Sequence, residues 1–262
     1  MIFLLRRSHF RIFLVKGVIM SQETANIAGM RKPYKGEQEI FDTEHLVALE
    51  PIGQFTDWFN LACQTDGIME ANAMALATAS KDGIPSVRMV LLKGYDKSGF
   101  KFYTNLESRK GKELEDNPQA SLLFYWTNIK SSQPTWSRQV RIEGTVELLS
   151  EEESTEYFNS RPRASQIGAL VSRQSTPISG RQVLNNRNAE LTEKYADESV
   201  KIAKPDYWGG YNVVPHTVEF WQGQTNRLHD RIVFRRPMPG EKLDPTIVRQ
   251  GQDGWIYYRL SP

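Results

Sequence analysis

The sequence of 262 residues is poor in the residue types that build disulfide frameworks and metal centres. It has one cysteine, Cys63, which excludes an intramolecular disulfide and fits a reducing compartment. Its four histidines are scattered at His9, His45, His216 and His229, so no cluster has metal-ligand spacing. We therefore expect no bound metal. Cys63 lies in an apolar run with helical spacing, and we expect it to pack in the core.

A strong charge of either sign is also absent. The 33 Lys and Arg residues nearly balance 31 Asp and Glu residues, which leaves a formal charge of +2. This charge is too small for general nucleic-acid binding, so the basic residues matter locally, and a basic nucleic-acid-binding barrel is disfavoured. Hydrophobic residues make up 39% of the chain, enough to bury a core. We expect neither a nucleic acid nor a membrane as partner.

The first 22 residues contain no acid, and the first acidic residue is Glu23. Basic residues interrupt their apolar ones, so no stretch there can span a bilayer. This composition is typical of a mitochondrial transit peptide. The alternative is an unstructured extension, with Met20 as a second start that would remove it. We treat residues 1–29 as a leader or disordered extension and expect a cytoplasmic protein, with mitochondrial import as the alternative.

Residues 30–262 hold many short apolar runs separated by turn residues, which predicts a β-barrel core. Asp82-Gly83 between two such runs is a strong hairpin signal. Strands are expected at 73–80, 85–95, 100–103, 120–126, 138–149, 211–214, 218–221, 227–235 and 255–260. Helices are expected outside the barrel at 51–65, 106–117, 150–160, 163–172 and 181–195. The fold class is therefore mainly β with packed helices (α+β).

The segment 221–236 concentrates cationic side chains. As an extended strand it would place Arg227, His229 and Arg231 on one face, because alternate side chains of a strand share a face. Beside Trp221, such a row suits a planar anionic ligand, since arginine offers a fixed fork of donors to phosphate. The alternative is a solvated basic edge strand.

The full string Trp221-Gln-Gly-Gln-Thr-Asn-Arg-Leu-His-Asp-Arg-Ile-Val-Phe-Arg-Arg236 closely resembles the C-terminal signature of the pyridoxine/pyridoxamine 5′-phosphate oxidase family of FMN enzymes. Further matching motifs are Glu70-Ala-Asn-Ala-Met74, Arg88-Met-Val-Leu-Leu-Lys93, Tyr103-Thr-Asn-Leu-Glu-Ser-Arg-Lys-Gly-Lys-Glu113, Arg138-Gln-Val-Arg-Ile-Glu-Gly144, Ser160-Arg-Pro162, Ser165-Gln-Ile-Gly168, Gln174-Ser175 and Trp208-Gly-Gly-Tyr211. They run in the family's order from about Met30 to Pro262, which a chance match does not explain. The resemblance implies an FMN-binding split β-barrel, dimeric, with the flavin at the subunit interface and a C-terminal dimerisation region at about 208–262.

The resemblance also implies residues that bind FMN. Arg109 and Lys110 begin an expected helix, where backbone N–H groups favour an anion, and the family uses this pair with Arg88 on the flavin phosphate. A merely charged helix face is the alternative. The other implied FMN contacts are Met89, Val90, Leu91, Tyr103, Thr104, Gln139, Gln174, Ser175, Trp221 and Arg231. In a regular strand, Arg88 and Lys93 would face opposite ways and should therefore serve different ligands.

A substrate phosphate site is indicated by spacing as well. Tyr157 and Arg161 are four apart on an expected helix and share a face, while Ser165 lies in the first turn of the next helix. The alternative is a routine helix corner with exposed polar groups. The resemblance assigns Tyr157, Arg161, Ser165 and Lys93 to the substrate phosphate. It also implies that Arg227, Leu228 and His229 contact the substrate ring and that Arg31 and Tyr34 close over it.

The implied activity is oxidation of pyridoxine 5′-phosphate and pyridoxamine 5′-phosphate to pyridoxal 5′-phosphate by dioxygen, in vitamin B6 metabolism. Hydrogen peroxide is released, with ammonia from the amine. Arg227 and His229 are the expected catalytic residues, and His229 could act as a base near neutral pH. The alternative is a non-catalytic FMN- or pyridoxal-phosphate-binding carrier on the same barrel, because a fold does not fix a function.

One segment departs from the family. Residues 127–137 are longer than the usual connection and rich in Ser, Asn, Gln and Pro, which predicts a loop. We expect a tolerated surface excursion, since longer loops cost little entropy. The alternative is that this segment disturbs Gln139 or the dimer interface.

Overall fold

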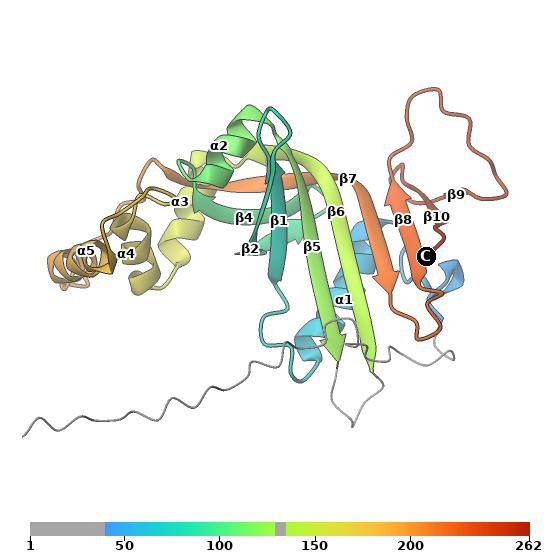
Figure 1. Ribbon diagram of the computed structural model, residues 1–262, viewed down its shortest axis with the longest axis horizontal. Helices are drawn as coiled ribbons and strands as arrows, with labels where there is room; N and C mark the ends of the chain where they lie inside the picture. The colour runs from blue at the N-terminus through green and yellow to red at the C-terminus, as the bar shows by residue number, and fades with distance from the viewer. Residues whose placement is uncertain (1–39, 129–134) are drawn as a thin grey trace, which may run out of the picture. The chain divides into compact units, whose positions relative to one another are not determined.

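The computed structural model describes residues 40–128 and 135–262 (Figure 1). The predicted leader at 1–29, the substrate residues Arg31 and Tyr34, and the middle of the 127–137 segment lie outside this part of the chain. Within it, no helix is long and apolar enough to cross a membrane.

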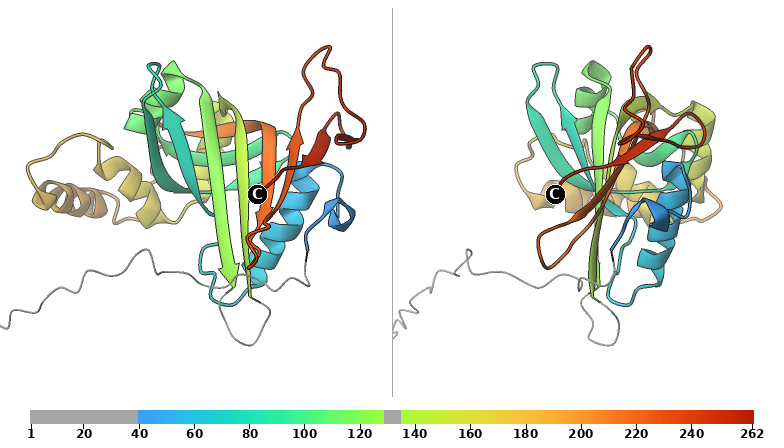
Figure 2. Two further views of the ribbon diagram at one scale, coloured as in Figure 1. Left: turned by 45° about the vertical axis from the view of Figure 1, so that its right-hand side comes forward. Right: turned by 90° about the vertical axis from the view of Figure 1, so that its right-hand side faces the viewer.

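The described residues form one antiparallel sheet of ten strands with helices against it (Figure 2). Its main path is β2-β1-β5-β6-β7-β8-β10-β9, and β4 pairs with both β3 and β7. The strands are β1 (Ala73–Ala79), β2 (Pro85–Leu91), β3 (Gly94–Asp96), β4 (Gly99–Asn105), β5 (Gln119–Asn128), β6 (Trp136–Leu148), β7 (Trp208–Gln222), β8 (Asp230–Arg235), β9 (Arg249–Gln250) and β10 (Ile256–Arg259).

Strand β7 joins the two parts of the sheet. One edge pairs with β6 along nearly its whole length, while β4 and β8 share the other edge. Strand β4 takes Trp208–Val213 and β8 takes Thr217–Gln222, so the two strands leave β7 at different halves. The register between β6 and β7 shifts at this division: Glu143 pairs with Thr217 and Gly144 with Pro215, so His216 is an extra residue that forms a bulge on β7. A Cβ on Gly144 would lie 2.3 Å from the Val214 carbonyl oxygen. The barrel is therefore split at the middle of β7.

Aromatic side chains fill the barrel. Helix α1 (Pro51–Gln64) inserts Phe55 and Trp58, which are almost fully buried. The Phe55 ring lies 5.0 Å from Phe100 and 5.1 Å from Phe124, and Trp58 lies 5.3 Å from Phe220. Aromatic pairs at such distances add to the large area that they bury, so α1 closes one end of the core.

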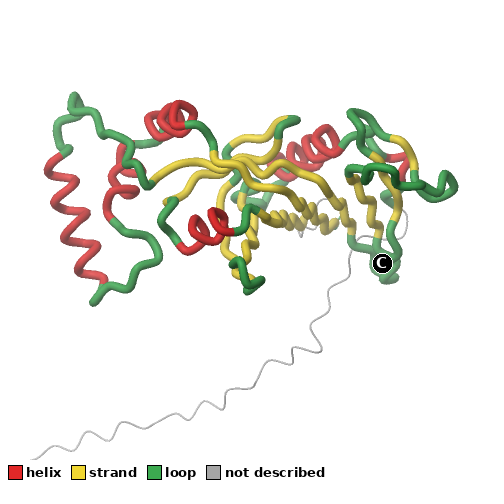
Figure 3. The backbone as a smooth tube through the Cα atoms, turned by 90° about the horizontal axis from the view of Figure 1, so that it is seen from above, coloured by secondary structure: helices red, strands yellow, loops and turns green. Residues whose placement is uncertain are grey.

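A second, smaller core lies where β4 and the start of β7 meet three helices. These are α3 (Glu151–Ser160), α4 (Arg163–Val171) and α5 (Arg181–Lys194). Phe158, Ile167, Leu191, Ile202 and Trp208 form its buried cluster. Viewed from above, α4 and α5 lie beyond one end of the strands, away from α1 (Figure 3). The remaining helix, α2 (Arg109–Asp116), follows β4.

The expected α+β class with helices packed on a barrel is confirmed, and each expected helix is present within a few residues. The strand prediction was wrong in three places. The expected strand at 85–95 breaks after Leu91, and the two expected at 211–214 and 218–221 are one strand, β7. The strand expected from Arg227 begins at Asp230, because Arg227 has a φ of 71° and extended backbone cannot include it.

Two predictions about single residues and segments also need correction. Cys63 is exposed on α1, so its expected place in the core was wrong, and Ala62 is buried instead. Parts of the expected 127–137 loop are strand, with Thr127 opposite Ser137 and Asn128 opposite Trp136. Trp136 is buried in the main core, so this part of the segment is not a dispensable excursion.

Candidate functional site

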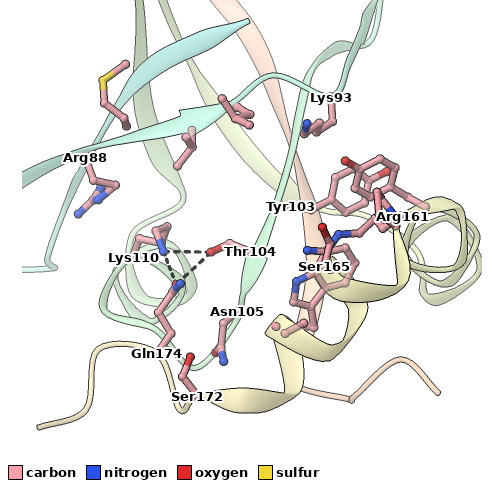
Figure 4. Close-up of a pocket in the computed structure, with 18 residues that line it drawn as sticks. Arg88, Lys93, Tyr103, Thr104, Asn105, Lys110, Arg161, Ser165, Ser172 and Gln174 are labelled. Carbon is pink, nitrogen blue, oxygen red and sulfur yellow. Dashed lines mark hydrogen bonds between the residues drawn. The ribbon is translucent and has the colours of Figure 1, made fainter. Parts of the chain in front are cut away.

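A cavity of about 770 Å³ opens between strands β2 and β4 of the barrel and helices α3 and α4 (Figure 4). This volume suits a cofactor with a small substrate. Many of the predicted site residues line it: Arg88, Met89, Val90, Leu91, Lys93, Tyr103, Thr104, Lys110, Tyr157, Arg161, Ser165 and Gln174. Arg109 and Ser175 line a neighbouring cavity of about 400 Å³, which shares Gln174 with the first.

Lys110 is surrounded by acceptor oxygens at one end of the cavity. Its ammonium donates to Gln174 Oε1 at 2.6 Å, Thr104 Oγ1 at 3.0 Å and Ser108 Oγ at 3.2 Å. Burial, and after it the positive charge of Arg88, lowers the pKa of Lys110 to about 8. A bound anion would offset both effects, so this end of the cavity is built to accept negative charge.

The start of α2 adds its own preference for an anion. Ser108 caps the helix and accepts from the Gly111 amide at 3.3 Å. Gly111 is required here, because a Cβ would lie 1.9 Å from the Leu106 carbonyl oxygen. The Ser175 hydroxyl accepts from the Arg109 amide at 3.2 Å, and Ser175 has a left-handed φ of 71°. The helix start therefore brings Arg109 and Lys110 together, as predicted.

Stacked aromatic rings form the opposite wall. The Tyr103 and Tyr157 rings lie 3.9 Å apart, and Trp208 lies 5.5 Å from Tyr103 with an interplanar angle of 10°. The Arg161 guanidinium lies 4.8 Å above the Trp208 ring. Its Nη1 is buried without a hydrogen-bond partner among the described residues, and burial lowers the pKa of Arg161. Buried donors normally have partners, so an anionic ligand group fits this position.

The reason given for one placement, that of Lys93, was wrong, although the residues do line the cavity. Arg161 directly follows α3 as its C-cap with a helical φ of −72°, one turn after Tyr157, and both residues line the cavity. Lys93 does not belong to the same regular strand as Arg88, because β2 ends at Leu91. The two cations therefore share one cavity, where strand alternation predicted opposite sides.

The other predicted residues form a second group elsewhere on the sheet. Gln139, Trp221 and Arg231 are direct neighbours on β6, β7 and β8. The Arg231 guanidinium donates to Glu219 Oε1 at 2.7 Å and to the Ser261 carbonyl oxygen at 2.8 Å. None of the three lines the 770 Å³ cavity. Leu228 and His229 line a separate cavity of about 320 Å³ near the C-terminal residues.

His229 lies in the loop before β8 rather than on a strand face with Arg231, so that prediction was wrong. Its ring lies 4.9 Å from Trp221, and its Nδ1 accepts from the Gln224 amide at 2.9 Å. A backbone amide can only donate, so Nδ1 carries no proton and the neutral ring keeps its proton on Nε2. Burial lowers the pKa of His229, and the charge of Arg227 lowers it further. In this neutral tautomer the ring can donate a hydrogen bond from Nε2.

Asp230 holds this loop in place. Its buried carboxylate accepts from Gln224 Nε2 at 2.6 Å and from the Phe41 amide at 3.0 Å, and it pairs with Arg259. The loop that carries Arg227 and His229 is thereby tied to the chain near Phe41 and to β10.

Two buried glutamates were missed by the sequence reasoning. Glu113 contacts Arg88 and Arg109, and Glu219 contacts Arg141 and Arg231. Glu113 follows Arg109 by four residues on a helix, and this spacing was a usable signal for an ion pair. Glu219 shares a strand face with Trp221, but its arginine partners lie on neighbouring strands that the sequence does not align.

Comparison with known proteins points to one family. The sequence profile described as pyridoxamine 5′-phosphate oxidase matches residues 64–195, and the profile described as the pyridoxine 5′-phosphate oxidase C-terminal dimerisation region matches residues 208–262. A pyridoxine/pyridoxamine 5′-phosphate oxidase of Bombyx mori is 52% identical over 237 residues, with 90% of each chain covered. A pyridoxine-5′-phosphate oxidase of Bos taurus is 53% identical over 238 residues, covering 90% of this chain and 88% of that one.

Solved structures show the same fold. PhzG from Burkholderia lata, in complex with tetrahydrophenazine-1-carboxylic acid, has a TM-score of 0.70 and 28% sequence identity, covering 86% of this chain and 98% of its own. A pyridoxamine 5′-phosphate oxidase-related, FMN binding protein from Nostoc punctiforme has a TM-score of 0.57 at 15% identity, which bears on the fold alone. The expected split barrel is confirmed.

The lowered pKa of Lys110 predicts how ligand affinity depends on pH. A phosphate monoester loses its second proton near pH 6, so its charge is constant above about pH 7. Lys110 of the free protein loses its charge as the pH rises through about 8. We therefore expect the Kd for FMN to rise between pH 7.5 and 9.5, by up to about tenfold per pH unit. Fluorescence titration with FMN measures this Kd at each pH. Lys110→Met should bind FMN more weakly, with a Kd that does not change over this pH range. A parent protein whose Kd is independent of pH would contradict the role of Lys110 in binding the phosphate.

Proposed function

The chain belongs to the pyridoxamine 5′-phosphate oxidase family, and we propose on this basis that it oxidises pyridoxine 5′-phosphate and pyridoxamine 5′-phosphate to pyridoxal 5′-phosphate with FMN and dioxygen. One structural observation carries the proposal. A single cavity has two separate cationic ends, Arg88 with Lys110 and Lys93 with Arg161 (Figure 4). Two ends suit two phosphates, one from the cofactor and one from the substrate.

The cofactor phosphate is proposed to bind at Arg88, Arg109 and Lys110. Arg161, with its unpartnered Nη1, and the nearby Lys93, Tyr157 and Ser165 are proposed to bind the substrate phosphate. Cationic donors at both ends fix the distance between the two ligands, because each phosphate has one place to bind. This positioning is the main work of the protein, since bound FMN would supply the redox chemistry between the substrate and dioxygen.

Both reactions balance in atoms and electrons, and neither leaves an additional proton on a side chain of the protein. The alcohol substrate loses two hydrogens, dioxygen becomes hydrogen peroxide, and the amine substrate also takes up water and releases ammonia. Arg227 and His229 are proposed to orient the substrate ring. His229 would do so as a hydrogen-bond donor from Nε2, because the Gln224 amide occupies Nδ1.

The complete site is proposed to need two copies of the chain. Trp221, Arg231 and His229 belong to the second group, which does not line the cavity of their own subunit. The family profile over 208–262 describes a dimerisation region, and β7 and β8 lie within it. A homodimer can place the second group of one subunit against the cavity of the other, which gives two equivalent sites by symmetry.

Kinetics of two variants separate an oxidase from a carrier. The parent should purify yellow, release free FMN on denaturation and form peroxide with either phosphorylated substrate. Arg227→Ala should keep its flavin and lose kcat/KM by about 100-fold, because ring orientation is lost. Arg161→Ala should mainly raise KM, since its phosphate contact exists in both ground and transition states. A parent that binds pyridoxal phosphate but forms no peroxide would establish the carrier alternative.

Mixed dimers test the shared site. Arg161→Ala and Arg227→Ala disable different groups, so a dimer with one copy of each has one site with both changes and one site with neither. After subunit exchange at equal amounts, half of the dimers are mixed and half of their sites are intact. At substrate concentrations far below the KM of Arg161→Ala, activity should therefore recover to about a quarter of the parent value. Each variant alone serves as control. No recovery, with exchange verified by mass, would place both groups in one subunit's site.

We propose a cytoplasmic location, with residues 1–22 as the signal for the mitochondrial alternative. The composition of this segment supports import, because it has four basic residues and no acidic one. A fluorescent reporter fused to this segment should remain diffuse in the cytoplasm. Accumulation in mitochondria, absent when the four basic residues are changed to Gln, would favour import.

A further inference from the structure

Glu113 is a buried carboxylate beside the cationic cavity. It projects from α2 toward β1 and β2, and its side chain is 8% exposed. Its Oε2 accepts from Ser86 Oγ at 2.6 Å and from the Thr78 hydroxyl, and lies 3.4 Å from Arg88 Nη2. Its Oε1 accepts from Arg109 Nε at 2.8 Å. One carboxylate therefore links the two arginines proposed for the cofactor phosphate.

The contacts of Arg88 leave its guanidinium little freedom. Besides Glu113 and Ser86, it donates from Nη1 to the Leu76 carbonyl oxygen at 3.1 Å and to Thr78 Oγ1 at 2.6 Å. Thr78 and Ser86 contact Arg88 and Glu113 alike, so the four side chains form one closed network. A flexible arginine would lose rotamer entropy on binding a ligand, and this network removes that cost in advance.

The contact with Arg109 works in a different way. Glu113 accepts from Nε, and in the described part of the chain neither terminal nitrogen of Arg109 hydrogen-bonds to this carboxylate. Arginine binds phosphate through such a fork of donors. Because the Arg109 side chain is 60% exposed, little else in the described structure holds it. Glu113 therefore sets the direction in which this fork points.

A buried carboxylate this close to an anion site stays ionised only if other groups stabilise its charged form. Burial alone would raise the pKa of Glu113, but hydrogen bonds from Ser86, Thr78 and Arg109 outweigh burial and hold it at about 2. The group is thus an acceptor at every pH at which the protein works. Its negative charge also opposes the repulsion between Arg88 and Arg109.

We propose that Glu113 is a positioning residue of the cofactor phosphate site: it touches no ligand and acts by orienting Arg88 and Arg109. This inference rests on the proposed FMN function. It goes further in predicting that Glu113 contributes to the affinity for the phosphate and not for the flavin ring. The hydrogen-bond acceptor, more than the charge, is the property that matters.

Glu113→Met tests the acceptor, because methionine has a similar length and fills the same buried space. The Kd for FMN should rise by about tenfold to hundredfold, as expected when hydrogen bonds to charged groups are lost. The Kd for riboflavin, which lacks the phosphate, should stay within about twofold. Fluorescence quenching of each flavin measures both constants on the apoprotein, without reliance on activity. Glu113→Ala provides a second variant if Glu113→Met does not fold.

Two matched variants complete the design. Glu113→Gln keeps one acceptor oxygen and places an amide donor where the other oxygen accepted, so it retains only part of the network. The FMN Kd should rise by less than in Glu113→Met, by about threefold to tenfold. Glu115→Ala removes an exposed carboxylate from the same helix and should leave both Kd values unchanged.

Each other outcome overturns the inference. Unchanged FMN affinity in Glu113→Met would show that the arginines need no positioning. Equal losses for FMN and riboflavin would indicate a general structural role. A loss in Glu113→Gln as large as in Glu113→Met would show that charge, and not the acceptor geometry, is what counts. A parent that binds no FMN would instead contradict the proposed function, which distinguishes the two failures.

Discussion

The division of one β7 edge between β4 and β8 is the constraint on which the rest of the molecule depends. Strand β4 carries Tyr103 and Thr104 into the cavity, whereas β8 carries Arg231. Because the two strands pair with different halves of β7, these residues are separated along it. Under the proposed function, a symmetric pair of chains combines the two groups, and the topology explains why one chain does not bring them together.

Both groups use the same physical device. A buried glutamate accepts from two arginines, Glu113 from Arg88 and Arg109, and Glu219 from Arg141 and Arg231. Arginine side chains are long, and exposed ones adopt many rotamers whose loss weakens binding. A buried partner restricts them before any ligand arrives. The carboxylates also balance the excess positive charge, so the cationic residues can be close together without a bound anion.

The sequence alone was sufficient for the elements with strong local signals. Helix α1 and the turn at Gly83, which has a φ of 80°, follow from spacing and glycine, and the family motifs identified most cavity residues. It failed where tertiary pairing decides. Pro215 lies inside β7 opposite Gly144, beside the β7 bulge at His216, and the long strand continues past it, which a local pattern cannot show. Arg227 looked like strand by alternation, but its left-handed backbone turns the loop before β8. The role of Glu219 could not be predicted, because its arginine partners lie on neighbouring strands whose alignment the sequence does not show.

The pairing of β7 with β4 also bears on how the chain reaches its native state. Phe100 pairs with Val213, and α1 packs its Trp58 on Phe220, so contacts in both join residues more than a hundred positions apart. Topologies rich in such distant contacts fold slowly, because the loop must close before the contacts form. During synthesis Phe55 can pack on Phe100 and Phe124 early, but Trp58 cannot reach Phe220 until β7 has left the ribosome. The core is therefore completed only when the C-terminal third of the chain has been made.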